Sequence, residues 1–485
     1  MKCKTVLDYR HSDARLFKVW CLVLCLFLVS SFPLWYAIVG FGSAVKEVDI
    51  VVKGGIVVTM NAERVIIDDG FIAIKDGRIE AVGKVADLSP KYKAKNCIDA
   101  ARKLVMPGLI NTHTHAPMSL FRGIADDLPL MEWLNKYIFP AERKNVTRDF
   151  VKWGTYLSCL EMIRSGTTTY VDMYYFEDDV AQATKDSGMR ALLGETIIDF
   201  PAPDNKDVKT ALEYTENYLK KWKGDPLIIA AVAPHAPYTC SPEALTASKA
   251  LADKYDAPLL IHLSESKSEV QQIKEKYGAT SVEHLNKIGF LRERIIAAHS
   301  IWLTDEDIKI LKEKKVGIAH CPESNMKLAS GVAPITKLLK MGIPVGLGTD
   351  GAASNNNLDM FEEMDTAAKL HKLYNNDPTA LKAEEVVAMA TIGGAKAIGL
   401  DKEIGSLEAG KKADLIILTL NRPSGIPLYN IYSHLVYAMK GSEVETSIIN
   451  GKVVMKEGVL LTINEKAVYA KAYEYRDKII KSLKN

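Results

Sequence analysis

The chain has 485 residues, which is enough for two or three domains of ordinary size. Hydrophobic residues make up 48% and charged residues 25%, a composition that excludes a disordered, collagen-like or polytopic membrane protein. The formal net charge of +2 provides no basic field, so we expect no nucleic-acid partner. The 7 cysteines include no Cys-x-x-Cys pair, which argues against a disulfide framework and favours a reducing compartment.

The amino terminus departs from this composition. Residues 19–45 carry no charge and are mostly large and apolar, so the segment is long enough to cross a bilayer. The basic residues before it would keep the amino terminus on the cytoplasmic side. Two interpretations remain open. Residues 1–44 are either a signal anchor, which makes the protein membrane-anchored by a single helix, or the product of a misplaced start codon before a cytoplasmic protein.

Two segments of short alternating strands flank the central part of the chain. The first, 45–104, contains VDIVVKGGIVVTMN and GFIAIKDGRIEAVG, and the second, 401–460, contains ADLIILTL and VETSIINGKVVMKEG. Glycine and asparagine bound these runs, as is typical of strand ends. We expect the two segments to pair into one small β-sandwich domain, followed by a carboxyl-terminal helix over 461–485.

Between them, residues 105–400 alternate apolar runs with amphipathic helical stretches. The runs are LIIAAVAPH (227–235), APLLIHLSE (257–265), IIAAHS (295–300), VGIAHCP (316–322) and PVGLGTD (344–350). Each run is nearly continuous and ends in a polar residue, which is typical of parallel strands buried on both faces. The pattern predicts an α/β fold, a (β/α)₈ barrel with its chemistry at the carboxyl ends of the strands.

Three predicted strand ends carry four candidate metal-binding side chains. His113 and His115 in PGLINTHTH are two residues apart, so a strand directs both imidazoles to one face. His262 and Asp350 end two other runs. Three imidazoles and one carboxylate suit a divalent ion, Zn²⁺ first and Fe²⁺ second, with a position left for water. We expect one ion per subunit, because no lysine ends the 227–235 run as a two-metal site with a carbamylated lysine would require.

Three further polar residues extend the predicted site. Glu265 follows His262 by three residues, where a carboxylate can exchange protons with a reacting water and a leaving group. His299 ends the 295–300 run and can hydrogen-bond that water, and His235 ends the 227–235 run and can contact a substrate. Each also has a structural explanation, since carboxylates favour the first turn of a helix and histidines occur in cores.

These motifs, together with HCPESNMKLASG (320–331) and GLGTDGAASNNNLDMFEEM (346–364), resemble those of the amidohydrolase superfamily. The similarity runs from about residue 49 to residue 458. Within the superfamily the chain is most similar to the 5′-methylthioadenosine/S-adenosylhomocysteine deaminases, which include 5′-deoxyadenosine deaminases. The discriminating stretch is LFRGIADDLPLMEWLNKYIFPAE (120–142). The resemblance implies a hydrolase acting on C–N bonds of cyclic amidines and, by analogy, a homo-oligomer.

The resemblance also implies roles for individual residues. Trp133 would pack on the adenine ring, Glu142 would bind the ribose hydroxyls, and His235 would contact the ribose or base. Arg190 would contact the 5′ substituent. Glu265 would protonate the ring at N1, and Asp350 would touch both the metal and the substrate. The implied catalytic residues are Glu265, His299 and Asp350, and the implied metal ligands are His113, His115, His262 and Asp350.

The implied reaction is hydrolytic deamination of adenosine derivatives to the inosine analogues with release of ammonia. The candidate substrates are 5′-methylthioadenosine, S-adenosylhomocysteine, 5′-deoxyadenosine and adenosine, and the sequence does not rank them. A guanine deaminase or a triazine-type hydrolase is the first alternative, from which a ribose-binding Glu142 would distinguish this chain. A non-catalytic, membrane-tethered scaffold is a remote alternative, since every predicted ligand and Glu265 are present.

Overall fold

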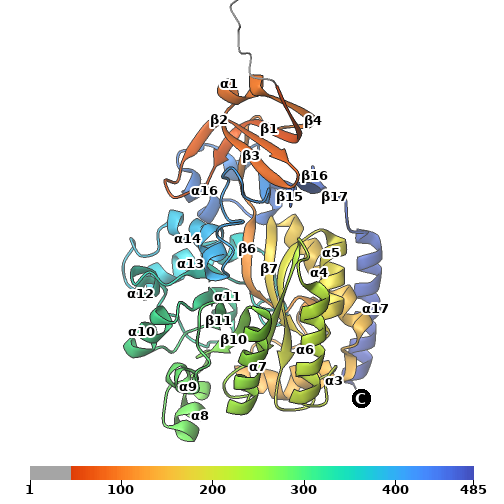
Figure 1. Ribbon diagram of the computed structural model, residues 1–485, viewed down its shortest axis with the longest axis vertical. Helices are drawn as coiled ribbons and strands as arrows, with labels where there is room; N and C mark the ends of the chain where they lie inside the picture. Colours follow the sequence, from red (N-terminus) through yellow and green to blue (C-terminus); the bar gives the residue numbers. More distant parts are fainter. Residues whose placement is uncertain (1–44, 485) are drawn as a thin grey trace, which may run out of the picture. The chain divides into compact units, whose positions relative to one another are not determined.

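A computed structural model describes residues 45–484 of the chain (Figure 1). The predicted membrane segment, 19–45, lies outside the described residues except for Val45. Among the residues that the structure describes, no helix is both long enough and apolar enough to span a membrane.

The central part of the chain folds into an eight-stranded parallel barrel, which confirms the predicted fold class. The strands follow one another in chain order around the barrel, and the last lies beside the first. Every residue of β6, β7 and β8 is buried, because the strands face the barrel interior on one side and helices on the other. The strands are β6 (Leu109–Thr114), β7 (Thr167–Tyr174), β8 (Arg190–Ile197), β9 (Ile228–Pro234), β10 (Leu259–Leu263), β11 (Ile295–His299), β12 (Gly317–His320) and β13 (Val345–Leu347).

Helices connect the barrel strands and cover their outer face (Figure 1). Most begin at a side-chain cap, such as Thr280 and Thr304, each of which closes a capping box with an acidic residue three positions on. The helices are α4 (Arg148–Arg164), α5 (Glu177–Ser187), α6 (Val208–Trp222), α7 (Pro242–Tyr255), α8 (Lys267–Tyr277), α9 (Ser281–Lys287), α10 (Asp305–Glu313), α11 (Pro322–Lys327), α12 (Ile335–Lys340), α13 (Met360–Tyr374), α14 (Ala383–Met389) and α15 (Ile392–Ala397).

The two terminal segments form one mostly antiparallel sheet of nine strands. Strand β5 pairs with β14, so the sheet joins the chain before the barrel to the chain after it. Its strands are β1 (Lys46–Val58), β2 (Ile66–Lys75), β3 (Arg78–Lys84), β4 (Tyr92–Asp99), β5 (Lys103–Pro107), β14 (Leu415–Thr419), β15 (Val444–Ile449), β16 (Lys452–Lys456) and β17 (Val459–Leu460). Helix α16 (Ile431–Tyr437) lies between β14 and β15, and α17 (Glu465–Leu483) ends the chain.

The barrel closes where β13 meets β6. The Thr112 hydroxyl donates to the Leu347 carbonyl at 2.8 Å, and the backbone N–H of Asp350 donates to the His113 carbonyl at 3.0 Å. A Cβ atom at Gly348 would lie 2.8 Å from the backbone nitrogen of His113, so only glycine permits this approach. The closing contact therefore holds the two histidines of β6 against the segment that carries Asp350.

The segment after β6 lines the carboxyl end of the barrel before the chain enters α4. It consists of short helical pieces: η2 (Ala116–Phe121), α2 (Leu130–Glu132), η3 (Trp133–Ile138) and α3 (Phe139–Asn145). Helix α17 packs against α3, where the Asn145 side chain donates to the Ser482 hydroxyl at 2.8 Å. The carboxyl-terminal helix thus supports the wall that carries Trp133 and Glu142.

Candidate active site

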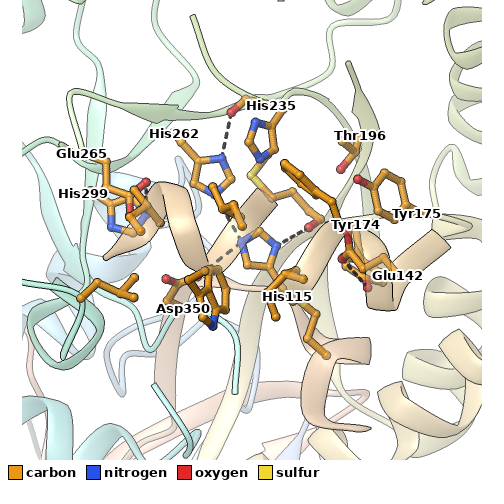
Figure 2. A pocket seen from close by; sticks show the side chains of 18 of the residues that line it. His115, Glu142, Tyr174, Tyr175, Thr196, His235, His262, Glu265, His299 and Asp350 are labelled. Atoms are coloured by element: carbon orange, nitrogen blue, oxygen red, sulfur yellow. Dashed lines mark hydrogen bonds and ion pairs between the residues drawn. The ribbon is translucent and has the colours of Figure 1, made fainter. Parts of the chain in front are cut away.

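Four predicted metal ligands meet at the carboxyl end of the barrel (Figure 2). His113 lies near the end of β6 and His115 directly follows this strand, His262 lies on β10, and Asp350 lies in the turn after β13. The Nε2 atoms of His115 and His262 are 3.2 Å apart. Asp350 Oδ1 lies 3.3 Å from His115 Nε2 and 3.5 Å from His113 Nε2. Side chains from the first, fifth and last barrel strands therefore converge on one small volume.

The hydrogen bonds of the histidine rings fix which nitrogen faces this volume. His115 Nδ1 donates to the Met173 carbonyl at 2.6 Å, and His262 Nδ1 donates to the His235 carbonyl at 2.8 Å. Both Nε2 atoms then carry lone pairs, which repel each other at this distance unless a cation lies between them. His113 Nε2 is buried with no hydrogen-bond partner among the described residues. This donor set fits a divalent metal ion.

Burial also favours the protonation states that metal binding needs. Burial lowers the pKa of His113 to about 4 and holds the pKa of His262 well below its usual range, so both rings are neutral. Burial would raise the pKa of Asp350, but the neighbouring histidines, His113 first, outweigh burial and hold this pKa well below its usual range. Asp350 Oδ2 also accepts hydrogen bonds from the hydroxyls of Ser324 at 2.6 Å and Ser354 at 2.9 Å.

Glu265 and His299 lie beside the ligand cluster, and both are buried. His299 Nε2 is 3.9 Å from Glu265 Oε2, and His299 Nδ1 donates to Asn325 Oδ1 at 2.9 Å. Burial raises the pKa of Glu265, which favours a carboxyl that holds a proton. Burial lowers the pKa of His299, but the neighbouring Glu265 and Asp350 carboxylates reverse this and raise it. The pair can therefore hold and exchange protons next to a metal.

A second glutamate holds the loop that carries Glu265. The buried Glu269 carboxylate accepts the backbone N–H groups of Ser264 and Glu265, each at 2.8 Å, and the Ser281 hydroxyl at 2.8 Å. Ser264 has a left-handed backbone with φ +51°, which is costly for a residue other than glycine. Glu269 therefore stabilises a strained turn directly before Glu265. Glu269 cannot be recognised as a site residue from the sequence, where it resembles an ordinary acidic residue in the first turn of α8.

The predicted substrate residues Trp133, Glu142 and His235 line the same pocket. Glu142 is buried and accepts a hydrogen bond from the Tyr174 hydroxyl at 2.7 Å, and burial raises its pKa to about 7. Trp133 Nε1 donates to the Ala125 carbonyl at 3.1 Å, which fixes the indole ring. Burial lowers the pKa of His235 to about 3, so this ring is neutral.

Several lining residues were missed by the sequence analysis. They are mainly aromatic or aliphatic: Met118, Leu130, Leu134, Ile138, Phe139, Met173, Tyr174, Tyr175, Thr196, Tyr238 and Leu328. Three of them lie on β7 or β8, and Tyr175 follows β7 directly; neither strand was identified from the sequence. The run TTTYVDMY of β7 is rich in β-branched and aromatic residues, a strand signal that could have revealed it.

Arg190 requires a correction. It begins β8, whereas Thr196 near the other end of the same strand lines the pocket. The Arg190 guanidinium donates to both carboxylate oxygens of Asp414, Nε at 2.8 Å and Nη2 at 3.1 Å, and to the Pro226 carbonyl at 2.8 Å. Arg190 therefore ties the amino end of the barrel to the terminal sheet and does not reach the pocket. The expected contact with a 5′ substituent does not fit this position.

The comparisons with known proteins agree with this geometry. Residues 104–454 match the model of the Amidohydrolase family. A 5-methylthioadenosine/S-adenosylhomocysteine deaminase of Syntrophus aciditrophicus is 49% identical over 439 residues, which cover 90% of this chain and 99% of the relative. A 5′-deoxyadenosine deaminase of Methanosarcina acetivorans is 45% identical, covering 89% and 98%.

The fold also matches solved structures. An adenosine deaminase from Xanthomonas campestris, crystallised with bound zinc, superposes with a TM-score of 0.88 at 39% identity and covers 90% of this chain and 99% of that one. Because the family model spans most of the described residues and these relatives match along nearly their full length, the chain belongs to the amidohydrolase family.

Proposed function

We propose that the protein is a metal-dependent aminohydrolase that converts adenosine derivatives into the corresponding inosine derivatives. One observation carries the proposal: Glu265, whose pKa burial raises, lies beside His299 and the three-histidine, one-aspartate cluster at the mouth of the barrel. The deaminase names of relatives at 45–49% identity support adenosine derivatives as substrates. The candidates are 5′-methylthioadenosine, 5′-deoxyadenosine, adenosine and S-adenosylhomocysteine.

The metal in this proposal is one Zn²⁺ ion per subunit, with Fe²⁺ as the alternative, held by His113, His115, His262 and Asp350. The zinc bound by the Xanthomonas campestris relative supports this choice. When bound, such an ion acts as a Lewis acid and lowers the pKa of a coordinated water molecule toward neutrality. The hydrogen bonds of His115 and His262 to backbone carbonyls orient their rings for this task.

The proposed proton transfers use Glu265, His299 and Asp350. Glu265 donates a proton to N1 of the adenine ring, which makes C6 more electrophilic. His299, oriented by Asn325, accepts a hydrogen bond from the attacking water, and Asp350 receives a proton from it. The C6–O bond forms and the C6–N bond breaks. One proton of the water leaves with the amino group as ammonia, and the other replaces the proton that Glu265 gave to N1, which the inosine product keeps. One water is consumed for each ammonia released.

Three further residues would bind the substrate. Trp133 would pack on the adenine ring, His235 would contact the ribose or base, and Glu142 would accept hydrogen bonds from the ribose hydroxyls. Figure 2 shows Glu142 with Tyr174 on the side of the pocket opposite Glu265 and His299. This separation supports a substrate that places its base at one end and its sugar at the other. A guanine deaminase or triazine-type hydrolase would have no use for a buried carboxylate there.

The experiment is ammonia release by the full-length protein after its metal content has been measured. The panel contains the four adenosine derivatives together with adenine and guanine. We expect turnover of the nucleosides, no turnover of the free bases, and loss of activity on chelation that added Zn²⁺ restores. Turnover of guanine alone, or of none of the compounds, would overturn the proposal.

A further inference from the structure

In the described part of the chain, no cationic side chain lines the side of the pocket away from Glu265. Tyr175 and Thr196 lie beside Tyr174 and Glu142, on the side of the pocket away from Glu265 and His299 (Figure 2). Ile138 and Phe139 line the same pocket from η3 and α3. Tyr175, Thr196 and Ile138 are almost fully buried. Tyr175 and Thr196 form what we call the distal wall.

No lysine or arginine lines the pocket in the part of the chain that the structure describes. The basic residues next in sequence to lining residues are occupied or face away. Lys327, which precedes the lining residue Leu328, is bound to Asp126 and Asn356, and Arg143, which follows Glu142, is exposed to solvent. Arg190, on the same strand as Thr196, is held by Asp414 at the other end of that strand.

The layer behind the distal wall is acidic rather than basic. Glu195 precedes Thr196 and is fully buried, where its carboxylate accepts the backbone N–H of Glu177 at 3.0 Å and the Asn205 amide at 3.2 Å. The Glu177 carboxyl is buried too, and neither of its oxygens has a hydrogen-bond partner among the described residues. A negative group brought to the distal wall would therefore meet carboxyl groups and no cation.

Given the function proposed above, this charge distribution predicts different activities toward the candidate substrates. With the base at Glu265 and the ribose at Glu142, the 5′ substituent points to the distal wall. A hydrogen, a hydroxyl or a methylthio group can lie against Tyr175 and Thr196 at little cost. A homocysteinyl group ends in a carboxylate and an ammonium, and a carboxylate that loses its water without gaining a cation is strongly disfavoured.

We propose that the distal wall selects adenosine derivatives with uncharged 5′ substituents and discriminates against an amino-acid tail. The wall discriminates because it offers no cation to the carboxylate of the tail, and not because it excludes the tail sterically. Because the inference rests on the proposed function, its test uses compounds that separate charge from length.

The test compares kcat/KM for 5′-deoxyadenosine, 5′-methylthioadenosine, 5′-butylthioadenosine and S-adenosylhomocysteine. Butylthioadenosine extends about as far as the homocysteinyl compound but carries no charge. We expect the three neutral compounds to be used comparably and S-adenosylhomocysteine to be used at least about tenfold less well than butylthioadenosine. Equal use of these last two compounds, or a preference for S-adenosylhomocysteine, would overturn the inference.

A variant that supplies the missing cation sharpens the test. Thr196→Lys should raise the ratio of S-adenosylhomocysteine to butylthioadenosine turnover, and the matched control Thr246→Lys, on the exposed face of α7, should leave it unchanged. If Thr196→Lys does not fold, the comparison of substrates by the unmodified protein decides alone. Failure of all four compounds would overturn the proposed function itself, whereas equal use of all four would overturn only the role of the distal wall.

Discussion

The two ends of the barrel differ in whether their buried polar and charged groups have partners. At the amino end, Arg190 and Asp414 are almost fully buried and satisfy each other, and Asp414 also accepts the Asn450 backbone N–H at 2.6 Å. At the carboxyl end, His113 Nε2 has no hydrogen-bond partner among the described residues, and the Nε2 atoms of His115 and His262 face each other. Burial alone therefore does not distinguish a structural group from a functional one.

The backbone at the carboxyl end is strained at three residues in or beside the candidate site. Ser264, His299 and Asp350, all at the carboxyl end, have φ values of +51°, +68° and +61°, which residues with a side chain rarely adopt. Strain of this kind persists where the surrounding structure enforces it, and it concentrates at functional sites. At the carboxyl end, which we call the working end, strained residues and unpartnered polar atoms thus coincide with the candidate site. At the amino end, which we call the stabilising end, the buried Arg190–Asp414 pair is satisfied.

The largest effect on the working end should come from Glu265→Gln. Glutamine retains the shape of the side chain but has no proton to donate, so we expect kcat to fall by about 10²–10⁴-fold. Metal content and melting temperature should stay close to those of the unmodified protein. The matched control is Glu275→Gln on the exposed face of α8, which should leave kcat unchanged. Near-normal turnover by a Glu265→Gln protein with full metal content would contradict the role assigned to Glu265.

The largest effect on the stabilising end should come from Arg190→Met. Removing one partner leaves Asp414 buried without its cation, which should cost about 3–5 kcal/mol of unfolding free energy. KM for nucleosides should not change, because Arg190 does not reach the pocket. Arg148→Met, which breaks an exposed pair with Asp179, should cost about 1 kcal/mol or less. Denaturant titrations and steady-state kinetics measure both, and a raised KM with unchanged stability would restore the substrate role expected from the sequence.

Glu142→Gln should increase the stability of the protein at pH 8 and weaken its binding of nucleosides. Burial raises the Glu142 pKa from its ordinary 4.5 to about 7, so between these pH values the folded protein keeps a proton that the unfolded chain has lost. The free energy of unfolding therefore falls as the pH rises from about 4.5 to about 7, because the folded protein must then ionise the buried Glu142. It stays at this lower value at higher pH. The variant lacks this loss and should be about 2–3 kcal/mol more stable than the unmodified protein at pH 8, with little difference at pH 4.5.

The same Glu142→Gln variant should bind nucleosides more weakly, since an amide replaces the carboxylate that would accept the ribose hydroxyls. Urea titrations of the ligand-free proteins at the two pH values, together with KM measurements, examine both effects. A difference in stability that does not change with pH would refute the titration of Glu142.

The smallest effect should come from Glu269→Gln. The amide nitrogen cannot accept a hydrogen bond, so one of the two backbone N–H groups of Ser264 and Glu265 loses its partner. We expect kcat to fall about tenfold through misplacement of Glu265, with KM and metal content nearly unchanged. Glu275→Gln again serves as the control. A fall in stability without a change in kcat would show that Glu269 only supports the fold.

Much of the site could be predicted because its residues end recognisable apolar strands. His113, His115, His262, His299 and Asp350 each follow such a run, and parallel strands bring their carboxyl ends together. Arg190 was assigned wrongly because β8 was not identified, and without the strand's start and end its side chain could not be placed at one end of the barrel. The domain boundaries and the homo-oligomeric state stay predictions.

Other contacts could not be predicted because they depend on tertiary packing. Glu269 is a helix-start carboxylate like many others until the fold places the Ser264 turn and Ser281 against it. Tyr175 and Thr196 became pocket residues through the position of β7 and β8 around the barrel. Local sequence patterns identify strand ends, whereas the partners across a barrel follow only from its closure.

The closure of the barrel between β6 and β13 also bears on how the site is assembled. His113 and His115 leave the ribosome early, whereas Asp350 and the Gly348 contact come from the last barrel strand. A growing chain that has not reached residue 350 contains the three histidines of the proposed metal site but lacks Asp350. The contact between β6 and β13 that holds His113 and His115 in place is then incomplete. The complete set of proposed ligands therefore comes together only when the last strand closes the barrel.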